Sequence, residues 1–188
     1  MRKIVFVALF SLLVFANADV AGAAGGTGID LSGNWASEPS DGFDDTFGLE
    51  LGLNVDFKKL GLNVDSKNMD FQGRISLGYY DWDKGAPGTT LDYQRIPLFL
   101  GARVLTSLAP QVKLYGQLGL EFSFDDKDSY TGIPGVKQSD SELNVGVTPG
   151  IGLLFPITNS FYAAVRFDYH IISDDYATLG LTLGFNLP

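Results

Sequence analysis

The sequence predicts an all-β fold, an antiparallel up-and-down transmembrane β-barrel of about eight strands. Apolar and polar residues alternate with a period of two over long stretches, as they do in strands with two unlike faces. The chain of 188 residues contains 23 glycines and no cysteine. The glycines favour close backbone approaches between strands, and the absence of cysteine excludes disulfides and thiolate metal sites. The length fits a single domain.

The N-terminus predicts a secretory signal peptide over residues 1–18. Two basic residues precede an apolar stretch at residues 4–15, and the Ala-Asn-Ala motif at 16–18 has the small-x-small pattern of a cleavage site. Cleavage as late as Ala23 fits the same pattern. The apolar stretch is shorter than the ~20 residues of a spanning helix. We therefore expect an exported chain whose barrel domain covers residues 28–188, and such a chain enters a membrane only as a closed barrel.

The clearest strand covers residues 47–57, where every odd position is apolar and every even position is polar or glycine. A weaker alternation at residues 29–35 supplies the eighth strand, because a barrel with both chain ends on one side needs an even number. Segments of about nine to eleven residues cross a bilayer when tilted. In chain order, the expected strands cover residues 29–35, 47–57, 70–80, 95–104, 112–122, 143–153, 161–170 and 178–187.

The connections between these strands alternate in length, as outer loops and periplasmic turns do in outer-membrane barrels. They are long at residues 37–46, intermediate at 58–68, long at 81–91, short at 106–110, long at 125–141, short at 156–160 and short at 172–174. Only the last is shorter than its place predicts. The intermediate connection contains a second copy, at residues 60–65, of the LGLNVD motif of residues 51–56.

Aromatic residues indicate which face of the barrel points outward. On the apolar face they gather at both strand ends, as the two interfacial girdles of a lipid-facing surface do. They are Phe57, Phe71, Phe155, Phe161 and Phe185 beside the short turns, and Trp35, Phe47, Tyr79, Phe122, Phe124 and Tyr169 beside the long loops. The opposite face mixes glycines with both signs of charge, which suits a narrow lumen. The alternative is a soluble secreted barrel that buries its apolar face around an apolar ligand.

Three segments carry a resemblance to a known family: RIPLFLGAR at residues 95–103, LYGQLGL at 114–120 and LGLTLGF at 179–185. Together with the strand pattern of residues 29–187, they resemble the eight-stranded outer-membrane barrels of Gram-negative bacteria, of the OmpA, OmpX and opacity-protein type. The resemblance implies a location, integral to the bacterial outer membrane, with the lipid bilayer and lipopolysaccharide as partners. It implies no catalytic motif.

Charged residues on the lumen face are the main candidates for function. Buried charges must pair or neutralise, so we expect a lumen charge network of Glu50, Arg74, Arg103, Glu121, Arg166 and Asp168. One interpretation is a salt-bridge gate across a narrow water path. The favoured interpretation is a static polar plug that sets strand register, because an eight-stranded interior is filled by side chains.

Catalytic and metal-binding chemistry are both disfavoured. His170, the only histidine, is followed three residues later by Ser173, but residues three apart in a strand lie on opposite faces. We expect a solvated histidine at the barrel rim. Asp125, Asp126 and Asp128 lack the EF-hand spacing and are interpreted as a solvated acidic loop. The sequence thus predicts no enzyme, no cofactor and no metal site.

The net charge of -9, from 22 acidic and 13 basic side chains, excludes a nucleic-acid binder, whose phosphate contacts need clustered Lys and Arg. The expected outer loops hold most of the excess: Glu38, Asp41, Asp44, Asp45, Asp81, Asp83, Asp92, Asp125, Asp126, Asp128, Asp140, Glu142, Asp174 and Asp175. We expect a monomer with a structural or adhesin-like surface role, whose acidic loops meet an extracellular or host ligand. The alternative is a narrow pore for small solutes, gated by the lumen charges.

Overall fold

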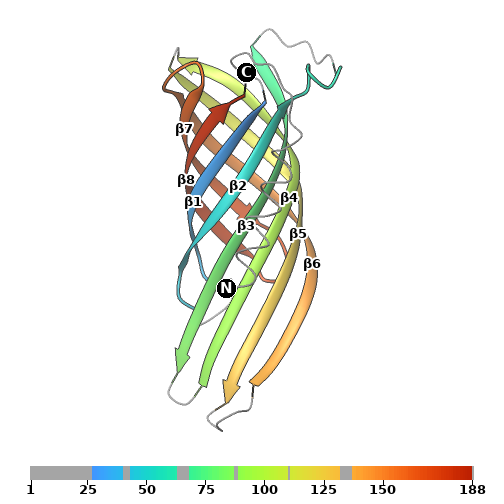
Figure 1. The fold of residues 1–188 in the computed structure, drawn as a ribbon, viewed down its shortest axis with the longest axis vertical. Coiled ribbons are helices and arrows are strands. Elements are labelled where there is room, and N and C mark those ends of the chain that lie inside the picture. The colour runs from blue at the N-terminus through green and yellow to red at the C-terminus, as the bar shows by residue number, and fades with distance from the viewer. Residues whose placement is uncertain are drawn as a thin grey trace.

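A computed structural model describes residues 27–39, 43–62, 68–86, 89–109, 111–131 and 137–187. Eight antiparallel strands pair in chain order, and the last pairs with the first to close a barrel (Figure 1). The strands are β1 (Gly28–Ala36), β2 (Thr46–Asp56), β3 (Met69–Ala86), β4 (Thr89–Ala109), β5 (Val112–Thr131), β6 (Lys137–Pro156), β7 (Phe161–His170) and β8 (Tyr176–Asn186). The predicted fold class is confirmed. In the described part of the chain, no helix is long and apolar enough to span a membrane.

The barrel has two unlike ends. At the inner end β1 begins and β8 ends, with Gly28 opposite Asn186. There, the connection after β2 starts as a tight turn in which Gly61 has a φ of 77°, a conformation that glycine adopts without a steric penalty. The signal-peptide residues and residues 63–67, which include the end of the repeated motif, lie outside the described part of the chain. The end of the barrel opposite the inner end is called the outer end.

Four strands are about twice as long as the other four. β1, β2, β7 and β8 have 9 to 11 residues, as predicted, whereas β3 to β6 have 18 to 21. The prediction of long loops at residues 81–91 and 125–141 is wrong, because most of these residues continue the strands. Asp83 pairs with Asp92, and Asp128 with Ser139. Outside the membrane neither face of a strand need be apolar, so the ladder continues where the alternation stops.

We call the projecting part the outer extension. It comprises residues 80–86 of β3, 89–95 of β4, 125–131 of β5 and 137–146 of β6, and it stands beyond the ends of the short strands at the foot of Figure 1. Only its two outermost strands, β3 and β6, lack a neighbouring strand on one side among the described residues.

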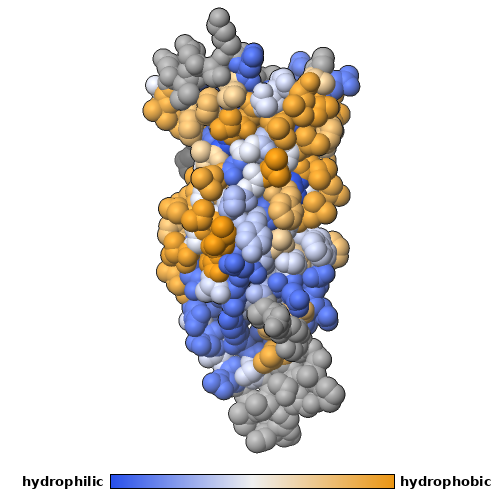
Figure 2. Space-filling model, turned by 180° about the vertical axis from the view of Figure 1, so that it is seen from behind, coloured by the Kyte–Doolittle hydropathy of each residue, from blue (hydrophilic) through white to orange (hydrophobic). Residues whose placement is uncertain are grey.

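The outside of the barrel is apolar around its inner part and polar around the outer extension. Figure 2 shows hydrophobic side chains toward the inner end and hydrophilic ones at the outer end. Phe47, Leu181 and Leu183 are each about 70–80% exposed, a pattern that matches lipid rather than water. At the inner end, the rings of Phe161 and Phe185 meet at 5.0 Å on this surface, as the predicted aromatic girdle requires.

The lumen is filled by side chains. Near the inner end it holds an apolar cluster of Leu105, Tyr115, Leu154, Tyr162 and Ala164. Near the outer end it holds Ala36, Tyr80, Trp82, Tyr93, Ile172 and Tyr176, which we call the outer aromatic cluster. Lumen glycines make room for the rings: a Cβ on Gly184 would lie 1.9 Å from the Tyr162 ring.

Candidate functional site

Glu50 stands at the centre of the charged lumen. Its carboxylate accepts a hydrogen bond from Arg74 Nη2 at 2.8 Å and another from Arg166 Nη1 at 2.7 Å. All three side chains are more than nine-tenths buried. Because β2, β3 and β7 carry these residues on their lumen-facing positions, one carboxylate joins strands on opposite walls of the barrel.

Two further carboxylates extend this arrangement. Arg74 also contacts Asp30 of β1, with Nη1 to Oδ2 at 2.6 Å, and Arg166 Nε lies 3.1 Å from Asp168 Oδ2. Opposite charges thus alternate along Asp30, Arg74, Glu50, Arg166 and Asp168, which we call the mid-lumen network. Each charge is compensated by at least one partner, as buried ions require.

Neutral side chains complete the hydrogen bonding of the network. Asn54 Nδ2 donates to Asp30 at 2.7 Å, and the Tyr162 hydroxyl donates to the same carboxylate at 3.1 Å. Gln117 donates to Asp168 at 2.7 Å and accepts from Arg103 Nη2 at 3.1 Å. Arg103 therefore touches the network only through an amide.

His170 does not lie on a solvated rim, and that expectation is wrong. The ring is only 6% exposed and stacks on Tyr176 with centroids 3.9 Å apart. Its Nδ1 lies 2.5 Å from Glu121, and its Nε2 lies 3.2 Å from Thr178. Position 170 lies on the lumen face at the end of the predicted strand 161–170, and the Tyr176 ring covers it from solvent. Because both ring nitrogens have partners, neither engages Ser173.

Glu121 belongs to a second, separate polar group. Besides His170, it accepts hydrogen bonds from the hydroxyls of Thr148 at 2.6 Å and Tyr176 at 3.2 Å. No contact joins it to Glu50 or Arg166 among the described residues. Glu121 therefore contacts the outer aromatic cluster, through Tyr176, and is separate from the mid-lumen network.

The acidic segment of β5 is also less solvated than we expected. Asp125 is buried and accepts hydrogen bonds from Arg95 Nε at 3.0 Å and Arg95 Nη2 at 2.8 Å. Asp126 and Asp128 are outward neighbours that accept hydrogen bonds from serines of β6, at 2.5 and 2.7 Å. Because successive residues of a strand face opposite sides, the lumen-facing Asp125 cannot share an ion with Asp126 and Asp128 on the outward face. No group of acidic and histidine side chains that could hold a metal occurs in the described ranges.

Stacked rings close the outer mouth of the lumen. Trp82 lies between Tyr80 and Tyr93, with centroids 5.5 and 5.4 Å away, and Tyr176 meets its edge at 5.7 Å. All four side chains are at most 1% exposed. The Arg95 guanidinium lies 4.8 Å from the Tyr176 ring, a favourable cation–π distance. The mouth is therefore covered by aromatic side chains.

All six residues expected in the lumen charge network lie in the lumen, yet they do not form one cluster. Four of them belong to the mid-lumen network, Arg103 reaches it through Gln117, and Glu121 pairs with His170. The expected network did not include Asp30, although this residue occupies a polar position of the weakest predicted strand. The expected network also left out the pair formed by Arg95, which begins a predicted strand, and Asp125, which fell in a predicted loop.

These features define an integral outer-membrane β-barrel with an apolar exterior, a filled polar lumen and a projecting sheet. The chain belongs to the outer membrane protein β-barrel domain family, whose model matches residues 4–187. No curated protein sequence matches it.

Several solved outer-membrane structures share the fold. Ail, the attachment invasion locus protein of Yersinia pestis, is 18% identical, with a TM-score of 0.56 over 86% of this chain and 96% of Ail. OprG from Pseudomonas aeruginosa is 14% identical, with a TM-score of 0.63 over 90% and 99%. The outer membrane enzyme PagL is 15% identical, with a TM-score of 0.51 over 86% and 99%. At these identities the likeness is one of fold.

Proposed function

We propose that this protein is a surface-interaction barrel, whose outer extension binds an extracellular partner while its lumen stays closed. The observation that carries the proposal is the length of β3 to β6, which continue as a paired sheet well beyond the apolar exterior. A barrel that only had to cross the bilayer would need no more than the 9 to 11 residues of the short strands.

The outer extension is acidic and carries an open cleft. Its strands hold Asp81, Asp83, Asp92, Asp125, Asp126, Asp128, Asp140 and Glu142 against Lys84, Arg95, Lys127 and Lys137. The cleft, of about 360 Å³, is lined by Phe43, Leu91, Asp92, Lys127, Asp128, Ser129, Gln138 and Asp140. Carboxylates beside an apolar wall suit the charged head and aliphatic stem of Lys or Arg. We infer a basic protein or peptide as the partner.

The neighbouring Ail structure offers a contrast in charge. Ail has been crystallised with the heparin analogue sucrose octasulfate, a polyanion, whereas an acidic extension repels polyanions. This chain would therefore bind ligands of the opposite sign at its outer end.

Binding to charged polymers tests the proposal. Protein in nanodiscs is expected to bind polylysine and not heparin, and to lose polylysine affinity as salt rises, because exposed charges are screened. Replacing Asp92 and Asp140 by Asn should weaken binding, whereas Asp70→Asn, which removes a charge at the inner end, should not. Equal binding of both polymers, or equal loss in the control, contradicts the assignment.

The filled lumen supports a plug rather than a gate. A water path would have to separate Glu50 from two guanidiniums and displace the outer aromatic cluster. Planar-bilayer recording of the wild type and Arg166→Ala tests this: we expect negligible current from both. A current that appears or changes strongly in Arg166→Ala would support the narrow-pore alternative.

We further propose a monomer without catalytic activity. The closed ladder leaves no free strand edge in the membrane-spanning part, which removes the usual template for strand-to-strand association. His170 has both nitrogens engaged inside the lumen. Mass spectrometry of lipid A from cells with and without the protein should show no difference, and a lost acyl chain would contradict this proposal.

A further inference from the structure

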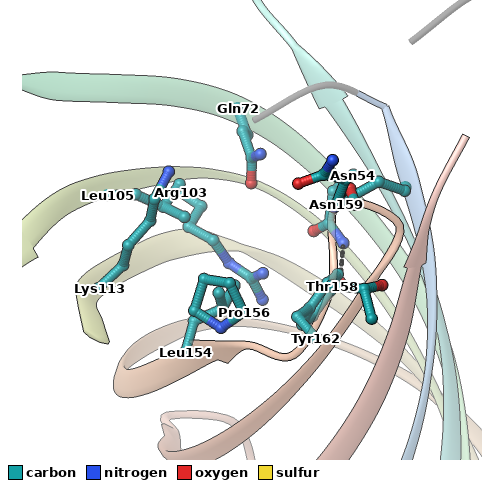
Figure 3. Close-up of a pocket in the computed structure, with 12 residues that line it drawn as sticks. Asn54, Gln72, Arg103, Leu105, Lys113, Leu154, Pro156, Thr158, Asn159 and Tyr162 are labelled. Atoms are coloured by element: carbon teal, nitrogen blue, oxygen red, sulfur yellow. Dashed lines mark hydrogen bonds between the residues drawn. The ribbon is translucent and has the colours of Figure 1, made fainter. Parts of the chain in front are cut away.

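The inner end of the lumen contains a cavity whose lining is cationic. It has a volume of about 120 Å³, and its polar lining includes Asn54, Gln72, Arg103, Lys113, Thr158 and Asn159 (Figure 3). Among the residues that the structure describes, no carboxylate lines the cavity, although acidic side chains outnumber basic ones by 22 to 13 in the whole chain. This sign reversal sets the inner cavity apart from the outer cleft.

Arg103 is the buried charge of this cavity. Its side chain is 3% exposed, and its guanidinium points into the cavity in Figure 3. Nη2 donates to Gln117, Cζ lies 4.2 Å from the Tyr115 ring centre, and Nε has no acceptor. Arg74, Arg95 and Arg166 each contact a carboxylate, but in the described part of the chain Arg103 contacts none.

Lys113 adds positive potential at the mouth of the cavity. It pairs with Asp70 at 3.1 Å, but the two side chains are 24% and 41% exposed, so this pair sits in water at the rim. Such exposed pairs contribute little binding energy of their own. A buried guanidinium without a carboxylate, in contrast, carries a desolvation cost that an incoming anion would offset.

Neutral groups in the lining can donate further hydrogen bonds. Thr158 Oγ1 accepts the backbone N–H groups of Ser160 at 3.2 Å and Phe161 at 3.0 Å. Its own O–H is therefore left to donate to another acceptor. The cavity volume is well above the roughly 10–15 Å³ that one water needs, so a group of several heavy atoms fits.

We propose that the inner cavity is a binding site for a small oxyanion, a phosphate or carboxylate group held by the Arg103 guanidinium. The planar guanidinium fork matches two oxygens of such a group with parallel hydrogen bonds. The cavity opens toward the periplasm, so the group belongs either to a free anion or to the headgroup of a phospholipid at the barrel rim.

Nuclear magnetic resonance of the full chain in nanodiscs of neutral lipid tests the site. Inorganic phosphate is titrated at constant ionic strength, maintained with sodium chloride, while the Arg103 Nε–Hε signal is followed. We expect a saturable shift. Arg103→Lys, which keeps the charge but loses the fork, should weaken the affinity by about tenfold or more, as measured on neighbouring backbone amides. Lys127→Gln, which removes a cation from the outer extension, should leave the affinity unchanged.

Two further arms identify the source of the anion. A saturable shift with acetate extends the site to carboxylates, and a shift in phosphatidylglycerol nanodiscs without added phosphate assigns a lipid headgroup. The proposal is overturned if none of these probes gives a saturable shift, if chloride alone gives the same one, or if Arg103→Lys binds as tightly as the wild type. The wild-type titration stands even if the variant does not fold.

Discussion

The lumen is closed twice, at two heights and by different chemistry. At mid-height the closure is ionic: Glu50 bridges Arg74 and Arg166, and Asp30 and Asp168 cap the row. At the outer mouth it is aromatic, with Trp82 packed among three tyrosines. The first closure contains full charges removed from water, whereas the second contains rings whose few polar atoms all have partners.

This difference teaches what each closure contributes. The mid-lumen network is costly to form because its charges are buried. It also fixes the strand register, because a shift of one residue would leave each charge unpaired. The aromatic rings stabilise the outer end through their buried contact area, which does not require each residue to meet one exact partner. We infer that the mid-lumen network sets strand register and that the outer aromatic cluster holds the outer extension onto the barrel.

Removing Glu50 is the most damaging single change that we predict. Glu50→Ala leaves two buried guanidiniums facing each other, so the free energy of unfolding should fall by about 3–5 kcal/mol. Urea unfolding in lipid vesicles, followed by tryptophan fluorescence, measures this. Glu142→Ala, on an exposed outer position, should change it by less than about 0.5 kcal/mol. A loss for Glu50→Ala no larger than the control would show that the network does not stabilise the barrel.

Truncating Trp82 should cost slightly less and act locally. Trp82→Ala empties the centre of the outer aromatic cluster, and large-to-small changes of this kind cost about 3 kcal/mol. We expect protease cleavage within the outer extension while the remaining barrel still migrates as a folded, heat-modifiable band. Trp35→Ala, a lipid-facing change at the end of β1, should leave the extension resistant. Loss of the folded band would mean instead that the cluster supports the whole barrel.

The alternation of residue types predicted that the six residues of the expected charge network face the lumen, but it did not predict their neighbours. Glu50 and Glu121 both point inward, yet they belong to separate clusters, because the height of a residue depends on strand tilt and register and not on period. The extension was missed for another reason. Asp81, Asp83 and Asp92 are poor strand formers, and only cross-strand hydrogen bonds, which a sequence does not display, place them in a sheet.

Removing the Tyr176 hydroxyl, which joins the outer aromatic cluster to Glu121, should lower the free energy of unfolding moderately. Tyr176→Phe keeps the ring against His170 and Trp82 but loses the 3.2 Å hydrogen bond to Glu121. The expected loss is about 1 kcal/mol, measured by urea unfolding. Tyr169→Phe, whose hydroxyl is on the exposed face, should be neutral within error. If Tyr176→Phe left the free energy of unfolding unchanged, the hydrogen bond to Glu121 would not stabilise the outer aromatic cluster.

We predict the smallest loss of stability for the Lys127–Asp174 ion pair, which is as short as the pairs of the mid-lumen network but is exposed to water. Lys127 Nζ lies 2.7 Å from Asp174, as close as Arg74 lies to Glu50, but the two side chains are 46% and 23% exposed. Water and salt already stabilise both charges, so Lys127→Ala should cost only about 0.2–1 kcal/mol.

Salt separates the two cases further. The Lys127→Ala difference should vanish at high ionic strength, because exposed charges are screened, while the Glu50→Ala loss should persist, because water and ions do not reach the lumen. Urea titrations of both variants at low and high sodium chloride measure this. If the Glu50→Ala loss also disappeared with salt, water and ions would have access to mid-height. The lumen would then be a conducting path and not a plug.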